Sequence, residues 1–475
     1  MTVDIYETIN NNIYNFPKKL PYITVSSKGI SNGLSTIIND GADFGPDTYL
    51  GATTKNRYGP PYTQTSGIQE AFNYAASIAR PSFTTGNNNG YILPPVHLTT
   101  GKFVLNADFN LPLFTNNPQA ELPSFLLEGE GGNYYDSGTE IVLNGYNFYI
   151  GTPNQNQNNN GGFIIRDLGF TGAGNTNGNV FIQGFDVDNM YIIQNVGLNC
   201  GLYMDSWQNP YQVLIENVGA YEITLPSATQ LTLNNVWSAT GTWIKSTQNQ
   251  ISQINASSIA ETLIIGWANL NTQVHFQSWI SDYNIAGGSG PYVIANYIPP
   301  GYSSTLDLIV DNLMLFQGSS TSYQQFWGGF GTNHGTLNLK LHIKNLLLNG
   351  FTDFTLPSTG LNLLQFEIDE ITNVSGQSLT SLPIYINANG TTAGTISGRY
   401  INYRTNYKKI IFTFSGYEND TTTNQTINFP LPFNTSAIIS ANNTGLTIST
   451  TTSGITITAP NSTTTYNGIV IIEGY

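Results

Sequence analysis

The sequence predicts an all-β protein whose middle part winds into a right-handed parallel β-helix. Three observations lead to this fold class: a short motif returns along the chain, its apolar residues alternate, and the composition is poor in charge and rich in glycine and asparagine. Periods of about 20 to 30 residues are typical of solenoids rather than of compact globules. We therefore expect each copy of the motif to belong to one turn of a coil.

The motif consists of an apolar residue, any residue, Asn or an acid, and further apolar residues. Its alternating Ile, Val and Leu residues favour strands over helices. The longest gap between copies has room for roughly three or four degenerate ones. The third positions of the seven copies are Asp167, Asn195, Asn217, Asn235, Asn312, Asn345 and Glu370.

The polar third position fits a sharp corner in the chain. Asn tolerates the left-handed (αL) backbone conformation and its side chain hydrogen-bonds nearby backbone groups. If one corner of every turn carries Asn, these side chains are expected to stack into a ladder. Because Asn is abundant in this chain, the prediction depends on the seven matches together.

Composition limits the classes of partner. Charged residues make up 9% of the chain and the net charge is -14, so clustered Lys and Arg for a phosphate backbone are missing and nucleic acid is not expected as a partner. The single cysteine, Cys200, excludes an internal disulfide framework and is expected to be a buried apolar residue. No cofactor or metal is expected, because the histidines show no metal-ligand spacing and each is interpreted as a lone surface or strand residue. These histidines are His97, His275, His334 and His342.

The chain shows an extracellular character without membrane insertion. No run of about 18 apolar residues occurs, and residues 1–19 lack the basic start and apolar middle of a signal peptide. We expect a protein on the surface of a virus particle, released by assembly and host lysis. Eight sequons are candidate glycosylation sites, although a chain rich in Thr and Asn produces sequons by chance. They lie at Asn255, Asn373, Asn389, Asn419, Asn424, Asn434, Asn442 and Asn461.

The first part of the chain predicts an arm and a cap. Residues 1–38 show no strong pattern and are interpreted from their position as an arm that docks onto other virion proteins. Ser66 and Gln69 form a predicted capping box at the start of a helix that Pro81 ends. Short strands are expected at residues 91–95 and 101–105. The expected buried face of the helix consists of Ile68, Ala71, Phe72, Ala75, Ala76 and Ala79.

The order of these elements resembles a known superfamily. Asp40-Gly-Ala-Asp43, Ile68-Gln-x-Ala71, Ile92-Leu-Pro-Pro95 and Gly101-x-Phe103 resemble the N-terminal segment of pectate-lyase-like β-helix proteins, in particular the entry to viral tailspike-type β-helices. This resemblance covers about residues 39–375. It implies a cap and first turns over 39–160 and a main β-helix over 161–398. The helix would cover the open end of the coil, where apolar interior and strand edges are otherwise exposed.

Loops and the C-terminal part complete the predicted architecture. Residues 154–162, 283–304 and 318–335 read as loops, which in solenoids commonly gather on one face and build the binding surface. The basic residues Arg399, Arg404, Lys408 and Lys409 are interpreted as a solvated linker, with a polyanion site as the alternative. Beyond them, a small β-sandwich is expected over 399–475. Its six strands are expected at residues 410–414, 426–430, 437–440, 446–449, 454–458 and 468–472.

The C-terminal part also resembles a known module. The order Phe429-Pro-Leu-Pro-Phe433, Ala437-Ile-Ile-Ser-Ala441, Ile455-Thr-Ile-Thr458 and a closing apolar strand before Gly474-Tyr475 is similar to the tip domains of phage tail fibres. Such tips usually form trimers and contact host surface glycans. The resemblance therefore implies a homotrimer and a host glycan or glycoprotein as partner.

Catalysis is the main alternative to binding. Calcium-dependent lyases need clustered carboxylates with a nearby basic residue. Pectin hydrolases carry an adjacent pair of Asp residues, and no such pair occurs in this sequence. Asp186 and Asp188 share one strand face, with Asp205 a turn later, so they are candidates for glycoside hydrolysis, although corner acids explain them as well. Asp307 and Asp311 are four residues apart, which does not fit one strand face.

Tryptophans are the other candidates, because sugar rings stack on aromatic planes, although core packing explains a Trp equally well. The candidate glycan-binding residues are Trp207, Trp237, Trp243, Trp267, Trp279 and Trp327. The leading hypothesis is a tailspike-like or fibre-like attachment protein that recognises a glycosylated host surface. A virion-borne glycan depolymerase on the same scaffold and a purely structural spike or capsid component are the alternatives.

Overall fold

A computed structural model describes residues 22–29, 41–81, 91–116, 119–121, 123–131, 138–151, 162–174, 178–183, 190–205, 212–225, 230–239, 242–244, 251–256, 259–260, 263–266, 271–282, 292–316, 325–349, 359–373, 395–402, 408–417, 425–428, 438–442, 447–452, 454–458 and 466–474. The chain divides into two compact units. The first comprises Met1–Ser238 with Lys245–Ser252, and the second comprises Ala239–Ile244 with Gln253–Tyr475. The boundary falls inside the segment 161–398 that the sequence predicts as one β-helix.

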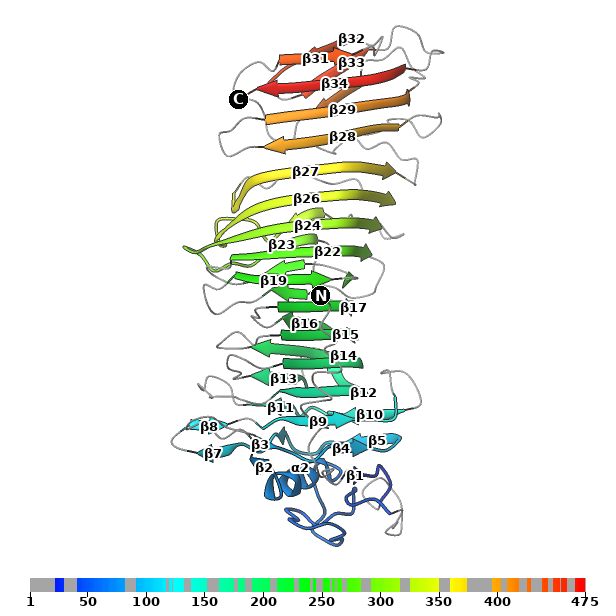
Figure 1. The fold of residues 1–475 in the computed structure, drawn as a ribbon, viewed down its shortest axis with the longest axis vertical. Helices are drawn as coiled ribbons and strands as arrows, with labels where there is room; N and C mark the ends of the chain where they lie inside the picture. Colours follow the sequence, from blue (N-terminus) through cyan, green and yellow to red (C-terminus); the bar gives the residue numbers. More distant parts are fainter. Residues whose placement is uncertain are drawn as a thin grey trace. The chain divides into compact units, whose positions relative to one another are not determined.

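Nearly all described elements are strands, which confirms the all-β class (Figure 1). The first unit contains α2 (Ile68–Ser77), β1 (Ile23–Val25), β2 (Arg80–Pro81), β3 (Tyr91–Ile92), β4 (Val96–Leu98), β5 (Gly101–Val104), β6 (Phe109–Asn110), β7 (Phe114–Asn116), β8 (Gln119–Glu121), β9 (Phe125–Glu128), β10 (Thr139–Val142), β11 (Phe148–Ile150), β12 (Phe163–Gly174), β13 (Val180–Gln183), β14 (Met190–Asp205), β15 (Gln212–Ala220), β16 (Glu222–Leu225) and β17 (Gln230–Ser238).

The remaining strands are β18 (Thr242–Ile244), β19 (Ile251–Ala256), β20 (Ile259–Ala260), β21 (Leu263–Ile265), β22 (Asn271–Asp282), β23 (Tyr292–Asn296), β24 (Ser303–Phe316), β25 (Gln325–Gly328), β26 (Thr336–Asn349), β27 (Leu361–Asn373), β28 (Thr395–Asn402), β29 (Lys408–Tyr417), β30 (Gln425–Asn428), β31 (Ile438–Asn442), β32 (Thr447–Thr450), β33 (Gly454–Thr458) and β34 (Tyr466–Gly474).

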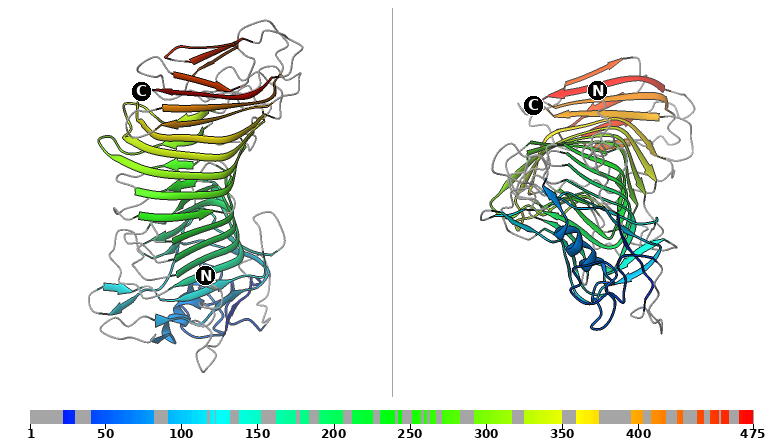
Figure 2. Two further views of the ribbon diagram at one scale, coloured as in Figure 1. Left: turned by 45° about the horizontal axis from the view of Figure 1, so that its top comes forward. Right: turned by 60° about the horizontal axis from the view of Figure 1, so that its bottom comes forward.

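Parallel pairing dominates the first unit. One series of parallel neighbours runs β1, β4, β9, β12, β14, β15 and β17. A second series runs β6, β11, β13, β14 and β16. Long strands such as β14 belong to both series, so the chain must turn a corner within them. Figure 2 shows the same strands in two further views.

The repeated motif supplies this corner. Asp167, Asn195, Asn217 and Asn235 have positive φ angles of 57°, 53°, 51° and 51°, as predicted for the third position. Asp and Asn are among the few residues besides Gly that visit the αL region, because their short polar side chains bond locally. The apolar residues on both sides stay in register from strand to strand, for example Ile193 beside Ile215 and Val196 beside Val218.

The predicted asparagine ladder is present at these corners. Each amide Nδ2 donates to the Oδ1 atom of the preceding turn: Asn195 to Asp167 at 2.8 Å, Asn217 to Asn195 at 2.9 Å, and Asn235 to Asn217 at 3.0 Å. The three asparagines are exposed to solvent. The ladder therefore connects neighbouring corners on the surface rather than inside the core.

The second unit repeats the ladder with a different corner. Strands β22, β24, β26 and β27 pair in parallel and in register. Asn345 Nδ2 donates to Asn312 Oδ1 at 3.1 Å, and Asn312 Nδ2 donates to the Gln277 carbonyl at 3.0 Å. Among the described residues, however, Asn312 and Asn345 do not have positive φ. Ser278 pairs with Asn312, so the segment around it is one of the degenerate copies that the sequence leaves unrecognised.

The residues between the corners build an apolar core. Inward side chains of successive strands stack on one another, such as Phe125 on Phe163 at 5.3 Å and Phe163 on Tyr191 at 4.6 Å between ring centroids. Cys200 is fully buried among them, as predicted, and burial raises the pKa of its thiol to about 12. The interior is therefore partly aromatic, not only aliphatic.

The helix is present, but its predicted capping box is wrong. Gly67 occupies the N-cap position in the αL region, and no side chain caps it. The Ser66 hydroxyl donates to the Val104 carbonyl at 2.9 Å, and the Gln69 backbone N–H donates to the Thr65 hydroxyl oxygen at 3.1 Å. Ala76 and Ala79 are only half-buried.

Glu70 is buried on the helix, which no apolar pattern predicts. Its carboxylate accepts hydrogen bonds from the Thr63 hydroxyl at 2.5 Å and the Gly51 amide at 3.2 Å. These donors tie the helix to the preceding loop.

Two further segments differ from their predicted roles. Within residues 1–38, β1 pairs in parallel with β4 and its Ile23 and Val25 are buried, so part of the predicted arm lies in the first unit's sheet. The predicted linker is partly strand, because Arg399 lies in β28 and Lys408 and Lys409 begin β29.

The six predicted C-terminal strands are all present as β29 to β34. They form, with β28, two antiparallel sheets in the orders β28-β29-β34-β31 and β30-β33-β32 (Figure 2, orange to red). Antiparallel pairing sets this region apart from the parallel strands that precede it.

Candidate functional site

The described part of the structure leaves the predicted catalytic acids untested. Asp186 and Asp188 lie outside the described residues. Asp205 is the last residue of β14, with its backbone beside Gln183 of β13, and its side chain also lies outside the described part of the chain. Their candidacy stays a prediction.

Two of the predicted glycan-binding tryptophans are core residues. Trp279 is 0% exposed and packs against the Phe276 ring at 5.4 Å, and Trp327 is 5% exposed. Both indole rings are therefore buried in the described structure, as the core-packing alternative expects. Trp237 is half-buried beside Gly219, whose missing side chain leaves room for the indole ring.

The other tryptophans and the sequons have little described geometry. Trp207 and Trp267 lie outside the described residues, and only the backbone of Trp243 is described, in β18. The backbones of Asn255, Asn373 and Asn442 lie in β19, β27 and β31. The remaining five sequons, at Asn389, Asn419, Asn424, Asn434 and Asn461, lie outside the described ranges.

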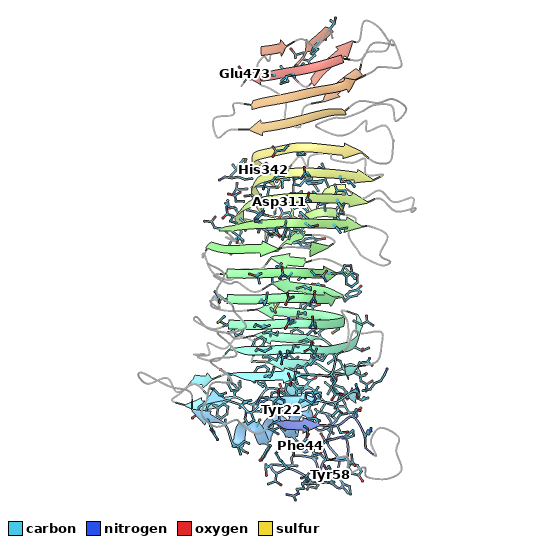
Figure 3. All side chains as sticks on the ribbon, turned by 45° about the vertical axis from the view of Figure 1, so that its right-hand side comes forward. Tyr22, Phe44, Tyr58, Asp311, His342 and Glu473 are labelled. Atoms are coloured by element: carbon cyan, nitrogen blue, oxygen red, sulfur yellow. The ribbon has the colours of Figure 1, made fainter. Side chains whose placement is uncertain are left out.

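A cluster of ionisable groups occupies the outer face of the first unit. Glu128 accepts a hydrogen bond from the Tyr22 hydroxyl at 2.6 Å and two from Arg166, at 3.1 Å from Nε and 2.8 Å from Nη2. His97 stands between two carboxylates, 3.4 Å from Glu128 and 3.2 Å from Glu130. We call these five residues the His97 cluster; Figure 3 labels Tyr22.

Parallel register creates the cluster. His97 pairs with Glu128, and Glu128 pairs with Arg166, although the three residues lie on strands far apart in sequence. The row continues as Gln194 and Glu216, whose side chains bond at 2.7 Å. No local sequence pattern predicts such a row. It can be predicted only once the register between the strands is known.

The electrostatics of the cluster favour ionised carboxylates. Burial works to raise the pKa of Glu128, but hydrogen bonds from Tyr22 and Arg166 outweigh it and hold that pKa below its usual value. The backbone amide of Thr100 and the side chain of His97 likewise lower the pKa of Glu130. Glu128 on β9 thus connects β4, β12 and Tyr22, the residue that precedes β1.

The second unit carries its own exposed polar face on β22, β24, β26 and β27. Asp311 lies 3.1 Å from His275 and 2.7 Å from Lys344, and His342 lies 2.9 Å from Asp369. Burial raises the pKa of Asp311, but Lys344 and His275 outweigh this and keep it lowered. Figure 3 shows Asp311 and His342 on neighbouring strands.

Three of the four histidines are thus paired with carboxylates. The prediction of lone histidines is wrong for His97, His275 and His342, because strands distant in sequence deliver an acid beside each ring. His334 packs edge-on against the Tyr297 ring. Within the described ranges, no group of three or more His, Cys, Asp or Glu residues is arranged to hold a metal ion.

Uncharged rows lie beside the ion pairs of the second unit. Asn271, Thr305, Asn338 and Asn362 occupy equivalent positions on four successive strands, and Asn362 Nδ2 donates to Asn338 Oδ1 at 2.9 Å. These side chains are exposed or half-exposed. Amide and hydroxyl groups in rows offer both donors and acceptors to a polar, uncharged ligand.

Neither a comparison with protein-family models nor a search of curated protein sequences finds a match to this chain. Within the described part of the chain, no helix has the length and apolar character needed to span a membrane.

Proposed function

We propose that this chain is a tailspike-like or fibre-like attachment protein, exposed on a virion, that recognises a glycosylated host surface. In this proposal the parallel strands form a right-handed β-helix of the pectate-lyase-like kind, with α2 as its cap. The two C-terminal antiparallel sheets pack as a β-sandwich tip, and the chain assembles as a homotrimer. The in-register parallel stack carrying the asparagine corners is the observation on which the proposal depends.

The stack supports this function because it holds side chains in fixed rows. Neighbouring strands lie about 4.8 Å apart, so equivalent residues on successive turns form a regular surface. A surface of this kind is suited to extended ligands such as glycans. The exposed amide rows of the second unit supply hydrogen-bonding groups without charge.

The described carboxylates favour binding over cleavage. A glycosidase needs a carboxylic acid with a raised pKa to protonate the leaving group. Within the described residues, neighbouring groups hold the pKa values of Glu128, Glu130 and Asp311 below their usual values. The polysaccharide depolymerase remains the second candidate, carried by Asp186, Asp188 and Asp205.

An array of immobilised neutral and acidic oligosaccharides, probed with the labelled full chain, tests the proposal. We expect binding to neutral oligosaccharides, and mass spectrometry of the same sugars after incubation should show unchanged chain lengths. Shortened products would establish the depolymerase instead. Absence of binding to every sugar would reject glycan recognition and favour the purely structural role.

Assembly is tested separately by light scattering. We expect the mass of three chains of 51.8 kDa. A monomer at micromolar concentration would contradict the proposed trimer while leaving glycan binding open to its own test.

A further inference from the structure

Two exposed tyrosines stand on one tight turn of the second unit. The turn between β23 and β24 reads Tyr297-Ile-Pro-Pro-Gly-Tyr302. Tyr297 is 41% exposed and Tyr302 is 52% exposed, which makes Tyr302 the most exposed large hydrophobic residue in the described part of the chain. Large aromatic rings are normally withdrawn from water, so two on one turn need an explanation.

A buried asparagine holds this turn in place. Asn296 is 0% exposed, and its side-chain amide donates to the carbonyl oxygens of Gly335 at 2.9 Å and Gly360 at 3.2 Å. Its Oδ1 atom accepts from the Ile298 amide at 3.0 Å. One side chain therefore joins three segments that are distant in sequence.

Backbone bonds complete the frame. The Gly335 N–H donates to the Ile298 carbonyl oxygen at 2.7 Å, and the Thr336 N–H donates to the Tyr302 carbonyl oxygen at 2.9 Å. Gly335 has no room for a side chain, because an added Cβ atom would lie 2.6 Å from the Pro299 carbonyl oxygen. The frame therefore holds the backbone of the turn that carries both tyrosines.

A third ring lies beside Tyr297, and uncharged polar residues flank that ring in sequence. The His334 ring packs edge-on against Tyr297, with centroids 5.4 Å apart and planes at 69°. The neighbouring Thr332 and Asn333 are exposed. Residues 292–304 and 325–336 contain no Asp, Glu, Lys or Arg.

We infer that Tyr297, Tyr302 and His334, here named the aromatic corner, form a stacking subsite for the rings of a neutral saccharide. This inference rests on the proposed glycan-binding function and adds the place and the class of sugar. Aromatic planes offer apolar area to the C–H faces of a sugar ring, while hydroxyl and amide groups at the rim bond its hydroxyls. A rigid frame lowers the ordering cost of binding. The lack of charge favours a neutral sugar over an acidic one.

The test compares Tyr302→Ala and Tyr302→Phe with the control Tyr146→Ala, which removes a 38% exposed tyrosine from a turn of the first unit. The affinity of each full-length variant for the neutral oligosaccharide that gives the strongest array signal is measured by calorimetry. We expect about a tenfold loss for Tyr302→Ala, and no loss for Tyr302→Phe or Tyr146→Ala, because stacking needs the ring and not the hydroxyl. Circular dichroism and unfolding midpoints verify that the variants are folded.

The outcomes separate the two proposals. Unchanged affinity of Tyr302→Ala, with normal binding by the wild type, would overturn the aromatic corner and leave glycan recognition standing. An equal loss for Tyr302→Phe would overturn the stacking explanation. A wild-type chain that binds no sugar would overturn both.

Discussion

Replacing Asn217 by Gly and by Ala separates the two roles of the corner residue. Asn217 has a positive φ of 51°, donates to Asn195 and accepts from Asn235. Both replacements remove these hydrogen bonds. Only the alanine also places a Cβ atom in the αL region without a polar side chain to compensate.

The magnitudes follow from these differences. The two solvent-exposed hydrogen bonds between side-chain amides together contribute about 1 kcal/mol to stability. The αL conformation costs an ordinary L-residue about 1 to 2 kcal/mol, whereas Gly adopts it freely but loses about 0.5 to 1 kcal/mol through its unfolded-state entropy. We therefore expect Asn217→Gly to destabilise the protein by about 1.5 to 2 kcal/mol and Asn217→Ala by about 2 to 3 kcal/mol.

Asn345 provides the matched control. It also belongs to a ladder, donating to Asn312, but it is not among the described residues with positive φ. Here Gly should be worse than Ala by about 0.5 to 1 kcal/mol. Guanidinium unfolding followed by circular dichroism gives the order of the two variants at each position. The same order at Asn217 and Asn345 would refute the reasoning about αL corners.

Three further predictions concern burial and charge. Because the pKa of Glu128 is lowered in the folded protein, the ionised carboxylate stabilises the fold above pH 4.5, the ordinary pKa, and this contribution is lost as the pH falls through the lower folded-state pKa. The difference in unfolding free energy between wild type and Glu128→Gln should therefore shrink between pH 6 and strongly acidic pH. A difference that stays constant over this range would contradict the ion pair. Because the pKa of the Cys200 thiol is raised to about 12, this thiol should resist iodoacetamide at pH 8 in the folded protein and react after unfolding. Alkylation of the folded protein would show that Cys200 is not buried. Trp279→Ala should cost about 3 to 5 kcal/mol by leaving a cavity, whereas a surface tryptophan would cost under 1 kcal/mol in the same unfolding experiment.

Local patterns predicted well those features that local chemistry determines. The corner residues Asp167, Asn195 and Asn217 follow from the αL preference of Asn and Asp, and the neighbouring Ile and Val residues follow from alternation. The C-terminal strands follow from the same alternation of apolar residues. Such features depend on residues close together in sequence.

Features that depend on register or on non-local contacts were not predictable in this way. The partners His97, Glu128 and Arg166 lie on different turns, so only the pairing of β4, β9 and β12 brings them together. The inner or outer face of Trp279 likewise depends on the strand phase in a segment without a clear motif. At the helix start, the Ser66 hydroxyl bonds to the Val104 carbonyl on a distant strand instead of capping the helix, which no local pattern predicts.

The central physical claim is that motif residues from successive turns lie side by side in a parallel stack. An experimental density map of the chain at side-chain resolution tests it most directly. We expect parallel strands about 4.8 Å apart, with the Asn217 amide against Asn195 and the Asn345 amide against Asn312. Antiparallel pairing of these strands, or asparagines from successive copies lying on opposite faces, would contradict the account.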